Sequence, residues 1–559
     1  MKRLSQLILV TCCLSVLIQS CKSGGSNVPV PKEAAFVMHI NNSSLSSKLS
    51  WQEIKATNWF KEAHAGASDS MLGKLMDDPD NSGMDTKADM MLFVKQQGRA
   101  SIMVFEGTVK DAAAFEAFNK KVSEGSTVSK AGDVSIMKMK DHGLASWKGN
   151  RFAYVLDVPF PDGMNSLSGR NNAAPYKFPM DSLQQFAVST YEISGKSSLG
   201  SDERFNALLK EPGDIHIWVN NEQYLSALSG DMLGMLKVAD LFKGNISANT
   251  IQFDNGKITM TGKQYLNDQL AALYKKFPPK KISAEVINRI PSQNVVGVLA
   301  MNYSPEGLKE LIKLTGMDGM ANGFLEKAGY SIEEFVKANK GDLVVAVSDL
   351  QINQQEISVP GMDGEKPSNY TQTKPEVKVL FATSVNDKAA FDKLITTLSG
   401  EIGEEKNMLP DINYQVDKNW FVAGNSADYV SKFLSGNGNK QPFTSKLTDQ
   451  SFGMYVDIQK IMTSTQNSIK NNGDKEAMNI SLKMWQDVIV TGGDFKDGAF
   501  TSYAELNMID KGTNSLKQLN QYIDKMSAIY TSKRSHKISM EENPSPADST
   551  TVTPVTPAK

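Results

Sequence analysis

The sequence has little cysteine, little histidine and no excess of either charge. Of its 559 residues, three are cysteines and five are histidines. The cysteines, Cys12, Cys13 and Cys21, all lie near the amino terminus, so the rest of the chain can form no disulfide, cysteine-containing zinc site or cysteine nucleophile. Sixty Lys and Arg oppose 62 Asp and Glu, for a formal net charge of −2. This balance argues against nucleic acid as a partner.

One long apolar run is present, and it is too short to cross a bilayer. Residues 7–18 are mostly apolar and follow a short basic start, which is the form of a cleaved secretory signal. The run ends in LIQSC at residues 17–21, which resembles a bacterial lipobox. By that resemblance residues 1–20 are a signal peptide, the thiol of Cys21 is lipidated, and residues 21–29 are a flexible tether. The alternatives are cleavage at an earlier cysteine and an ordinary signal peptide followed by a chance cysteine.

The residues that follow Cys21 bear on localisation. Position 22 is Lys and not Asp, and by resemblance to lipoprotein sorting patterns this favours the outer membrane over the inner membrane. Residues 22–24 also lack the acidic pair that resembles a surface-export signal, which favours the periplasmic side over the cell surface. We therefore expect an outer membrane lipoprotein in the cell envelope, with the membrane as a partner through the lipid anchor.

The body of the chain repeats itself. Residues 105–116, FEGTVKDAAAFE, align with residues 381–392, FATSVNDKAAFD. Three further matches keep the same order along the chain; they pair residues 31–44 with 291–304, residues 217–220 with 454–457, and the turn signal Asn255-Gly256 with Asp497-Gly498. We predict two tandem duplicated domains, joined and followed by less regular segments: a first repeat at 30–275, a linker at 276–290, a second repeat at 291–530, and a disordered Ser/Thr/Pro-rich tail at 531–559.

Apolar runs predict strands within each repeat, and periods of 3.6 residues predict helices. The expected helices lie at about 45–63, 111–122, 308–314, 331–339 and 389–398, and the clearest strands at 90–94, 102–105, 251–260, 343–347 and 377–381. Hairpins outnumber strand–helix–strand units, so the fold class is α+β, with mainly antiparallel sheets backed by helices.

The two repeats differ in length at two places that are rich in Pro and Gly. The first repeat carries an inserted loop at 157–201, and the second repeat carries one at 350–377, which we expect to be a protruding hairpin or loop. Because loops tolerate insertion and carry binding residues, these are the places where the repeats would differ in function.

Residues suited to catalysis or metal binding are sparse. The histidines are widely separated, at His39, His64, His142, His216 and His536. His39 and His216 lie in apolar strand patterns, where we expect ordinary packed or surface side chains. The sequence contains no zinc-binding helix motif, phosphate-binding loop or serine-nucleophile elbow. We therefore expect no enzyme activity, no catalytic residue, no cofactor and no metal.

An acidic loop near residue 80 has the outline of a calcium site. Counted from Asp78, oxygen-bearing side chains fall at the first, third and fifth positions, Gly83 at the sixth, and Asp89 at the twelfth. The twelfth position holds Asp in place of the longer Glu, and Pro79 follows Asp78. A solvated turn is therefore favoured over calcium binding by Asp78, Asp80 and Asp89.

Tryptophan side chains are the natural platforms for sugar binding. Six are present: Trp51, Trp59, Trp147, Trp218, Trp420 and Trp485. For each we expect packing in the core or a partial surface anchor in preference to glycan contact. Trp147, near two glycines, has the most loop-like setting.

Three features together resemble a family of uncharacterised Bacteroidota lipoproteins catalogued only as a domain of unknown function. They are the lipobox at Cys21, a first strand of the form P-x-x-A-x-F-V-M-H-I-N at 31–41, and the element V-x-D-x-A-A-F at 109–115 and 385–391. The resemblance implies an envelope lipoprotein with no assigned chemistry. We expect a non-enzymatic binding or structural component of the outer membrane, with envelope proteins or glycans as candidate partners. The alternatives are a glycan- or peptide-binding lipoprotein of a nutrient-uptake system and a hydrolase that uses two carboxylates.

Overall fold

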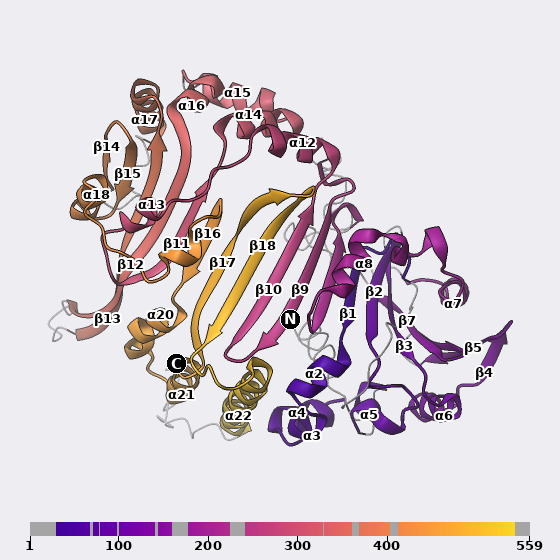
Figure 1. The fold of residues 1–559 in the computed structure, drawn as a ribbon. Coiled ribbons are helices and arrows are strands. Elements are labelled where there is room, and N and C mark those ends of the chain that lie inside the picture. Colours follow the sequence, from indigo (N-terminus) through magenta and orange to yellow (C-terminus); the bar gives the residue numbers. More distant parts are fainter. Residues whose placement is uncertain are drawn as a thin grey trace, which may run out of the picture.

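The computed structural model describes residues 30–67, 71–77, 79–97, 100–139, 143–158, 177–223, 241–327, 329–359, 368–402 and 412–542. The predicted signal peptide, Cys21, the tether, Asp78 and His142 lie outside these residues. At the centre of the described chain is one antiparallel sheet of 18 strands (Figure 1). From one edge to the other the strands are β4 (Val128–Ala131), β5 (Val134–Met139), β6 (Gly143–Lys148), β7 (Arg151–Val158), β3 (Ala100–Thr108), β2 (Met90–Gln97), β1 (Phe36–Ile40), β8 (Ile215–Asn220), β9 (Ile246–Asp254), β10 (Lys257–Tyr265), β18 (Ala499–Met508), β17 (Trp485–Lys496), β16 (Phe452–Val456), β11 (Val295–Asn302), β12 (Asn339–Val359), β13 (Ser368–Val385), β15 (Trp420–Gly424) and β14 (Asn413–Val416).

The strand order is the same in both halves when each is followed outward from the centre. Eight strands correspond: the first half runs β10, β9, β8, β1, β2, β3, β7, β6, with β5 and β4 beyond them at its edge, and the second runs β18, β17, β16, β11, β12, β13, β15, β14. The halves join where β10 pairs with β18, from Lys257 opposite Asn507 to Tyr265 opposite Ala499. The α+β class predicted from the sequence is confirmed. Descent of the two halves from one duplicated domain stays a prediction.

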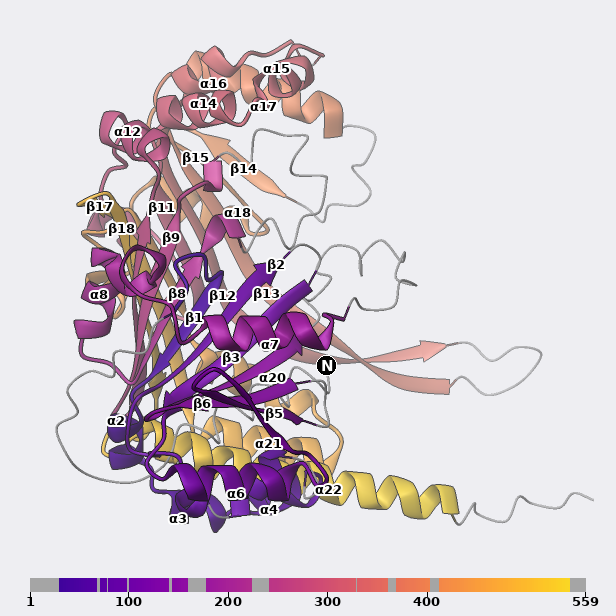
Figure 2. The same cartoon turned by 90° about the vertical axis from the view of Figure 1, so that its right-hand side faces the viewer.

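Helices gather at the two ends of the strands (Figure 2). Helices α12 and α14 to α17 lie at one end, and α2 to α4, α6, α21 and α22 lie at the other. The helices are α2 (Asn42–Lys48), α3 (Trp51–Lys55), α4 (Asn58–Ala65), α5 (Met71–Asp77), α6 (Ala112–Val122), α7 (Met180–Ser189), α8 (Glu203–Lys210), α12 (Asp268–Lys276), α13 (Ala284–Asn288), α14 (Pro305–Leu314), α15 (Asp318–Lys327), α16 (Ile332–Ala338), α17 (Lys388–Ile402), α18 (Ala427–Leu434), α19 (Thr444–Leu447), α20 (Ile458–Thr465), α21 (Asn472–Leu482) and α22 (Ser515–Glu542).

Two predictions differ from the structure: the single helix at 45–63 and the start of the disordered tail at 531. The single helix expected at 45–63 is divided into α2, α3 and α4, because Ser50 closes a capping box with Glu53 and starts a new helix. At the other end of the chain, α22 continues to Glu542, past residue 531 where a disordered tail was expected. This segment holds no Gly or Pro before Pro544, and residues such as Lys, Met and Glu favour a helix there.

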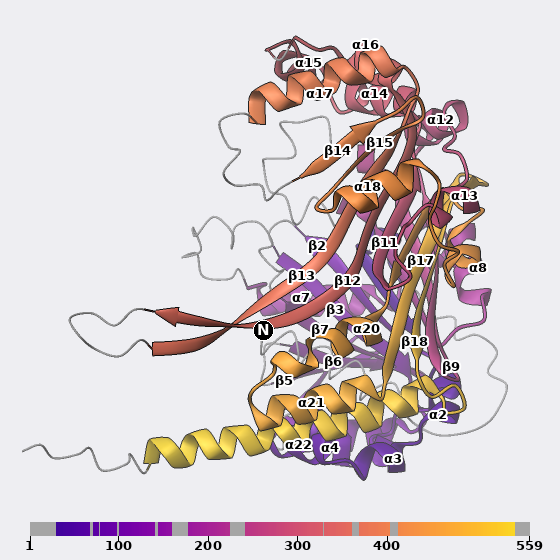
Figure 3. The same cartoon turned by 90° about the vertical axis from the view of Figure 1, so that its left-hand side faces the viewer.

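The second inserted loop, 350–377, forms a long hairpin arm. Strands β12 and β13 continue beyond the sheet, paired from Gln351 opposite Glu376 to Val359 opposite Ser368. Figures 2 and 3 show this arm projecting from the side of the molecule. In the first inserted loop, 157–201, residues 159–176 lie outside the described chain, and the remainder contains α7 and two short 3-10 turns.

Contacts between helices reinforce the junction between the halves. Helix α22 of the second half packs against α4 of the first. The indole Nε1 of Trp59 donates a hydrogen bond to Asn520 Oδ1 at 2.9 Å, and Ser527 and Thr531 both donate to the Glu62 carboxylate. Among the residues that the structure describes, no helix is both long and apolar enough to span a bilayer.

Candidate functional site

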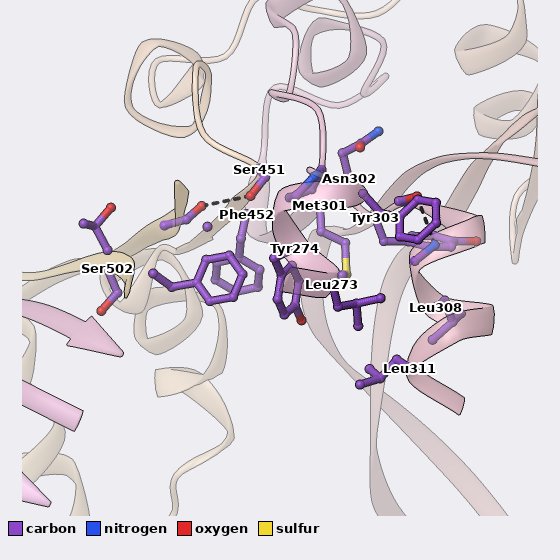
Figure 4. Close-up of a pocket in the computed structure, with 18 of the residues that line it drawn as sticks. Leu273, Tyr274, Met301, Asn302, Tyr303, Leu308, Leu311, Ser451, Phe452 and Ser502 are labelled. Atoms are coloured by element: carbon purple, nitrogen blue, oxygen red, sulfur yellow. Dashed lines mark hydrogen bonds between the residues drawn. The ribbon is translucent and has the colours of Figure 1, made fainter. Parts of the chain in front are cut away.

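A pocket of about 380 Å³ lies between α12, α14 and the ends of the strands beside them (Figure 4). Local sequence places both helices. Helix α12 ends at Lys276 with Phe277 as its C-terminal cap, and the Pro-Pro pair that follows cannot continue the helix. Helix α14 begins with Ser304 as its cap, which accepts a hydrogen bond from the Gly307 amide at 3.1 Å, and with Pro305 in the first turn.

The pocket wall is apolar with a few neutral polar groups. Figure 4 shows Leu273 and Tyr274 of α12 between Phe452 on the strand side and Leu308 and Leu311 of α14. Hydroxyl and amide groups on the wall come from Asn302, Ser304, Ser451, Thr491, Thr501 and Ser502. None of the residues that line the pocket is Asp, Glu, Lys, Arg or His. The cavity can therefore bury apolar surface, and it offers an ionised group no opposite charge.

Aromatic contacts fix α12 against the β17–β18 hairpin. The ring centroids of Tyr274 and Phe500 lie 4.4 Å apart in an edge-on arrangement, and Phe500 also packs against Phe495 at 5.2 Å. Burial raises the pKa of Tyr274, and it raises that of Tyr303 to about 12. Both phenols therefore keep their protons at neutral pH and are neutral hydrogen-bonding groups on the wall.

A break in strand pairing shapes the pocket on the sheet side. The register of β17 against β18 shifts between Gly492 and Phe495. Within this bulge Gly493 has a φ of +98°, and a Cβ there would lie 1.8 Å from the Ser451 hydroxyl oxygen. Only glycine fits this position, so the bulge depends on it.

Helix α14 presents an apolar face that the protein only partly covers. Its fully buried residues are Pro305 and Gly307, whereas Leu308, Leu311 and Leu314 are each half-buried. Leu308 and Leu311 face the pocket, and Leu314 does not line it. Two leucines of the helix thus keep apolar surface available to a ligand.

His39 and His216, predicted as unrelated packed or surface residues, meet across β1 and β8. Their Nδ1 atoms lie 3.0 Å apart, and His39 Nε2 lies 3.2 Å from Asp89 Oδ2. His216 Nε2 lies 2.9 Å from the carbonyl oxygen of Glu211, which can only accept, so this nitrogen carries a hydrogen. When His216 is neutral, its Nδ1 accepts a hydrogen bond from the Nδ1–H of His39, and the Nε2 of His39 lies beside the Asp89 carboxylate.

This histidine pair is a closed network. The two side chains are 7% and 3% exposed, and every ring nitrogen has a partner. Burial lowers the pKa of His216, which keeps it neutral. The sequence alone did not reveal the pair, because only the pairing of β1 with β8 brings these residues together. Of the other histidines, His64 on α4 lies beside Asp77, and His536 falls in α22.

The acidic residues with the outline of a calcium site have other partners. Asp80 accepts a hydrogen bond from Thr86 at 3.3 Å, and Asp89 belongs to the histidine pair. Within the described ranges, no three His, Cys, Asp or Glu side chains gather closely enough to hold a metal ion.

Five of the six tryptophans are buried, as expected for core residues, and Trp485 is half-buried against Tyr522. Trp147 was expected in a loop-like setting, and this was wrong. It lies in β6, is 6% exposed, and packs edge-on against Phe115 with ring centroids 5.6 Å apart. The neighbouring glycines belong to the strand and to the turn that follows it.

The fold and the pocket define an α+β protein with a preformed apolar cavity and no Asp, Glu, Lys, Arg or His in its wall. Residues 26–360 match the family described as a domain of unknown function, DUF4836, and the chain belongs to that family. No protein with a curated description is significantly similar to it.

Among solved structures, the chain has limited similarity to a protein named TP0453. Crystal form III of that protein matches with a TM-score of 0.25 and 9% identity, over 46% of this chain and 90% of that one. Crystal form IV matches with a TM-score of 0.22 and 10% identity, over 46% and 88%. Such scores do not establish a shared fold.

Proposed function

We propose that this protein is a non-enzymatic binding component of the cell envelope, and that the pocket between α12 and α14 is its ligand site. One observation carries the proposal: an open cavity of about 380 Å³ whose wall is apolar and uncharged. Small-molecule sites commonly have volumes of about 300–1,000 Å³ and mostly apolar walls with a few polar groups. The ligand class is therefore a small molecule with a neutral apolar portion.

The envelope address rests on the amino-terminal sequence. The lipobox LIQSC supports lipidation of Cys21, and Lys22 supports the outer membrane; the lack of an acidic pair at residues 22–24 supports its periplasmic side. Membership of a family that has only a domain-level description adds no activity to this picture.

The composition of the pocket wall favours binding over catalysis. Its hydroxyl groups come from Ser, Thr and Tyr, and no His, Asp, Glu or Lys stands among the lining residues to activate them. A glycan-binding role for this lipoprotein has less support, because five tryptophans that could form sugar platforms are in the core.

Fluorescence of the neutral apolar probe N-phenyl-1-naphthylamine tests the pocket directly. We expect the chain carrying Cys21→Ser, purified without its lipid, to bind the probe. Leu311→Trp fills the cavity from a half-buried position and should weaken binding at least tenfold. Leu314→Trp is the matched control on the same helix and should bind as the parent does. Absence of probe binding by the parent, or equal binding by both variants, would refute the proposed site.

Cell fractionation tests the anchor. We expect the natural chain in the membrane fraction and Cys21→Ser in the soluble fraction. Protease treatment of intact and lysed cells then gives the side of the membrane, with digestion only after lysis expected for a periplasmic protein. Membrane retention of Cys21→Ser would contradict lipidation at this residue.

A further inference from the structure

Four lysines stand close together where α12 ends. Lys275 and Lys276 lie in its last turn, and Lys280 and Lys281 follow the Pro-Pro pair. All four are exposed, and none of them forms an ion pair with any described residue. The result is a cluster of positive charge, hereafter the lysine cluster, that no described carboxylate neutralises through an ion pair.

The lysine cluster adjoins the pocket. The Lys276 Nζ lies 5.0 Å from the centroid of the Phe277 ring, and that ring lines the cavity. The backbone amide of Lys280 donates to Asn302 Oδ1 at 2.7 Å, and Asn302 also lines the cavity. Both segments of the cluster are thus attached to the pocket wall.

Five other lysines at this end of the molecule have acidic partners, whereas Lys327 and Lys340 form no ion pair with a described residue. The five paired lysines belong to α14, α16 and α17, and their ion pairs are Lys309–Glu333, Lys313–Glu310, Lys337–Asp387, Lys388–Asp392 and Lys393–Glu334. The lysine cluster differs from these in that four lysines without an ion pair to a described residue fall within residues 275–281.

The helix dipole accounts for part of the cluster only. Cations near a helix C-terminus offset the partial negative charge there, which is a structural role open to Lys275 and Lys276. Lys280 and Lys281 lie beyond Pro278 and Pro279, outside the helix, so this effect does not explain them.

We propose that the pocket takes the acyl chain of an anionic amphiphile, whose carboxylate or phosphate head group lies against the lysine cluster. This inference rests on the proposed function and names its ligand class. An ionised head group cannot enter the cavity, because the uncharged wall would strip it of water without offering an opposite charge. Lysine ammonium groups at the rim supply that charge while the head group stays hydrated.

Binding of cis-parinaric acid and of its methyl ester separates the head group from the chain. We expect the acid to bind the parent protein about five- to tenfold more tightly than the ester, since one exposed ion pair contributes at most about a fivefold gain. The double variant Lys276→Gln/Lys280→Gln should bring the two affinities within twofold of each other and leave binding of the ester unchanged. High salt should also reduce the difference in affinity between the acid and the ester, because it screens the exposed charges.

The matched control is Lys61→Gln/Lys110→Gln, which removes the same charge from two exposed lysines of the first half that are in no ion pair among the described residues. It should keep the preference for the acid. Competition by lysophosphatidylglycerol and by palmitate then shows whether a phospholipid or a free fatty acid supplies the anion, with lysophosphatidylcholine as the zwitterionic reference.

Equal binding of acid and ester by the parent would overturn the head-group assignment, and so would failure of both anionic lipids to outcompete the zwitterionic one. Binding of the neutral naphthylamine probe would then persist, and the proposed apolar site would stand. Loss of that probe's binding as well would overturn the proposed function together with this inference.

Discussion

Lowering the pH should destabilise the folded protein through the contact between His39 and His216. Their Nδ1 atoms, 3.0 Å apart, share one hydrogen. Protonation of His216 brings a second N–H into this contact, where two donors then face each other. The surrounding groups are Asp89, on the far side of His39, and Glu211, whose carboxylate is held by Lys263.

The direction of the pH effect follows from the lowered pKa of His216, which burial and the neighbouring His39 bring about. The unfolded chain binds this proton near the usual value of about 6.5, and the folded chain binds it at lower pH. The contribution of neutral His216 to the free energy of unfolding is therefore complete above about pH 6.5 and is lost as the pH falls below that value. A buried donor without an acceptor costs about 1–3 kcal/mol, so we expect the free energy of unfolding to fall by about that amount when His216 is protonated.

Urea unfolding at several pH values between 7.5 and 5 measures this loss. His216→Gln removes the titration and keeps an amide oxygen that can accept from His39, so its free energy of unfolding should fall less over this range. His64→Gln, in the surface helix α4, is the control and should keep the steeper pH dependence of the parent. Identical pH dependence of the parent and His216→Gln would refute the assigned hydrogen-bond pattern.

Three further outcomes concern stability. Asp214 is fully buried and accepts from the Lys48 ammonium at 2.6 Å, so Asp214→Asn should lower the free energy of unfolding by about 3–5 kcal/mol, measured in urea. Burial raises the pKa of Glu106 to about 8 even though Arg151 lies beside it, and Glu106 Oε1 lacks a hydrogen bond. As the pH rises from 5 to 8, the free energy of unfolding of the parent should therefore fall relative to that of Glu106→Gln, by up to about 1.4 kcal/mol per pH unit. Parallel pH profiles of the two proteins in urea unfolding would contradict this. Replacing the arm at 351–376 by a two-residue turn should change the free energy of unfolding by less than about 1 kcal/mol, because the arm contributes little buried surface, and a larger loss in thermal melts would show that it supports the core.

The sequence predicted several of the strands because hairpin signals and apolar runs are local, but the single strand expected at 251–260 was wrong, since it spans the turn between β9 and β10. Asn255-Gly256 and Asp497-Gly498 form the turns between β9 and β10 and between β17 and β18. The alignment of the two repeats was less accurate at β1 and β11. Ile40 pairs with Ile215, and Met301 pairs with Phe452, which is the counterpart of Ile215 when residues 217–220 are matched with 454–457. Met301 therefore takes the place of Ile40, whereas the alignment of residues 31–44 with 291–304 puts Ala300 there. One residue is enough to exchange the two faces of a strand.

The candidate site could not be predicted from sequence, because a pocket is space that side chains leave unfilled. Leu308 and Leu311 have the spacing of a core-facing helix, and nothing in that spacing shows that no side chain covers them. Gly493 carries no signal of its own, since only the register shift beside it reveals the bulge. The lysine cluster was visible as residues, but its position at the pocket depends on how the chain turns after α12.

The pairing of β10 with β18 makes the two halves depend on each other. The outer edges of the sheet, β4 and β14, are four residues long, whereas β10 offers nine residues of backbone to its neighbour. A fragment of residues 30–275 would leave that long edge bare, and a bare edge invites another strand. Because the pairing is antiparallel, a second copy of the fragment could supply that strand about a twofold axis, so sedimentation of the fragment should show dimers or larger assemblies. The natural chain has, in effect, a permanently tethered partner, and its halves cannot exchange with those of another molecule without opening the middle of the sheet.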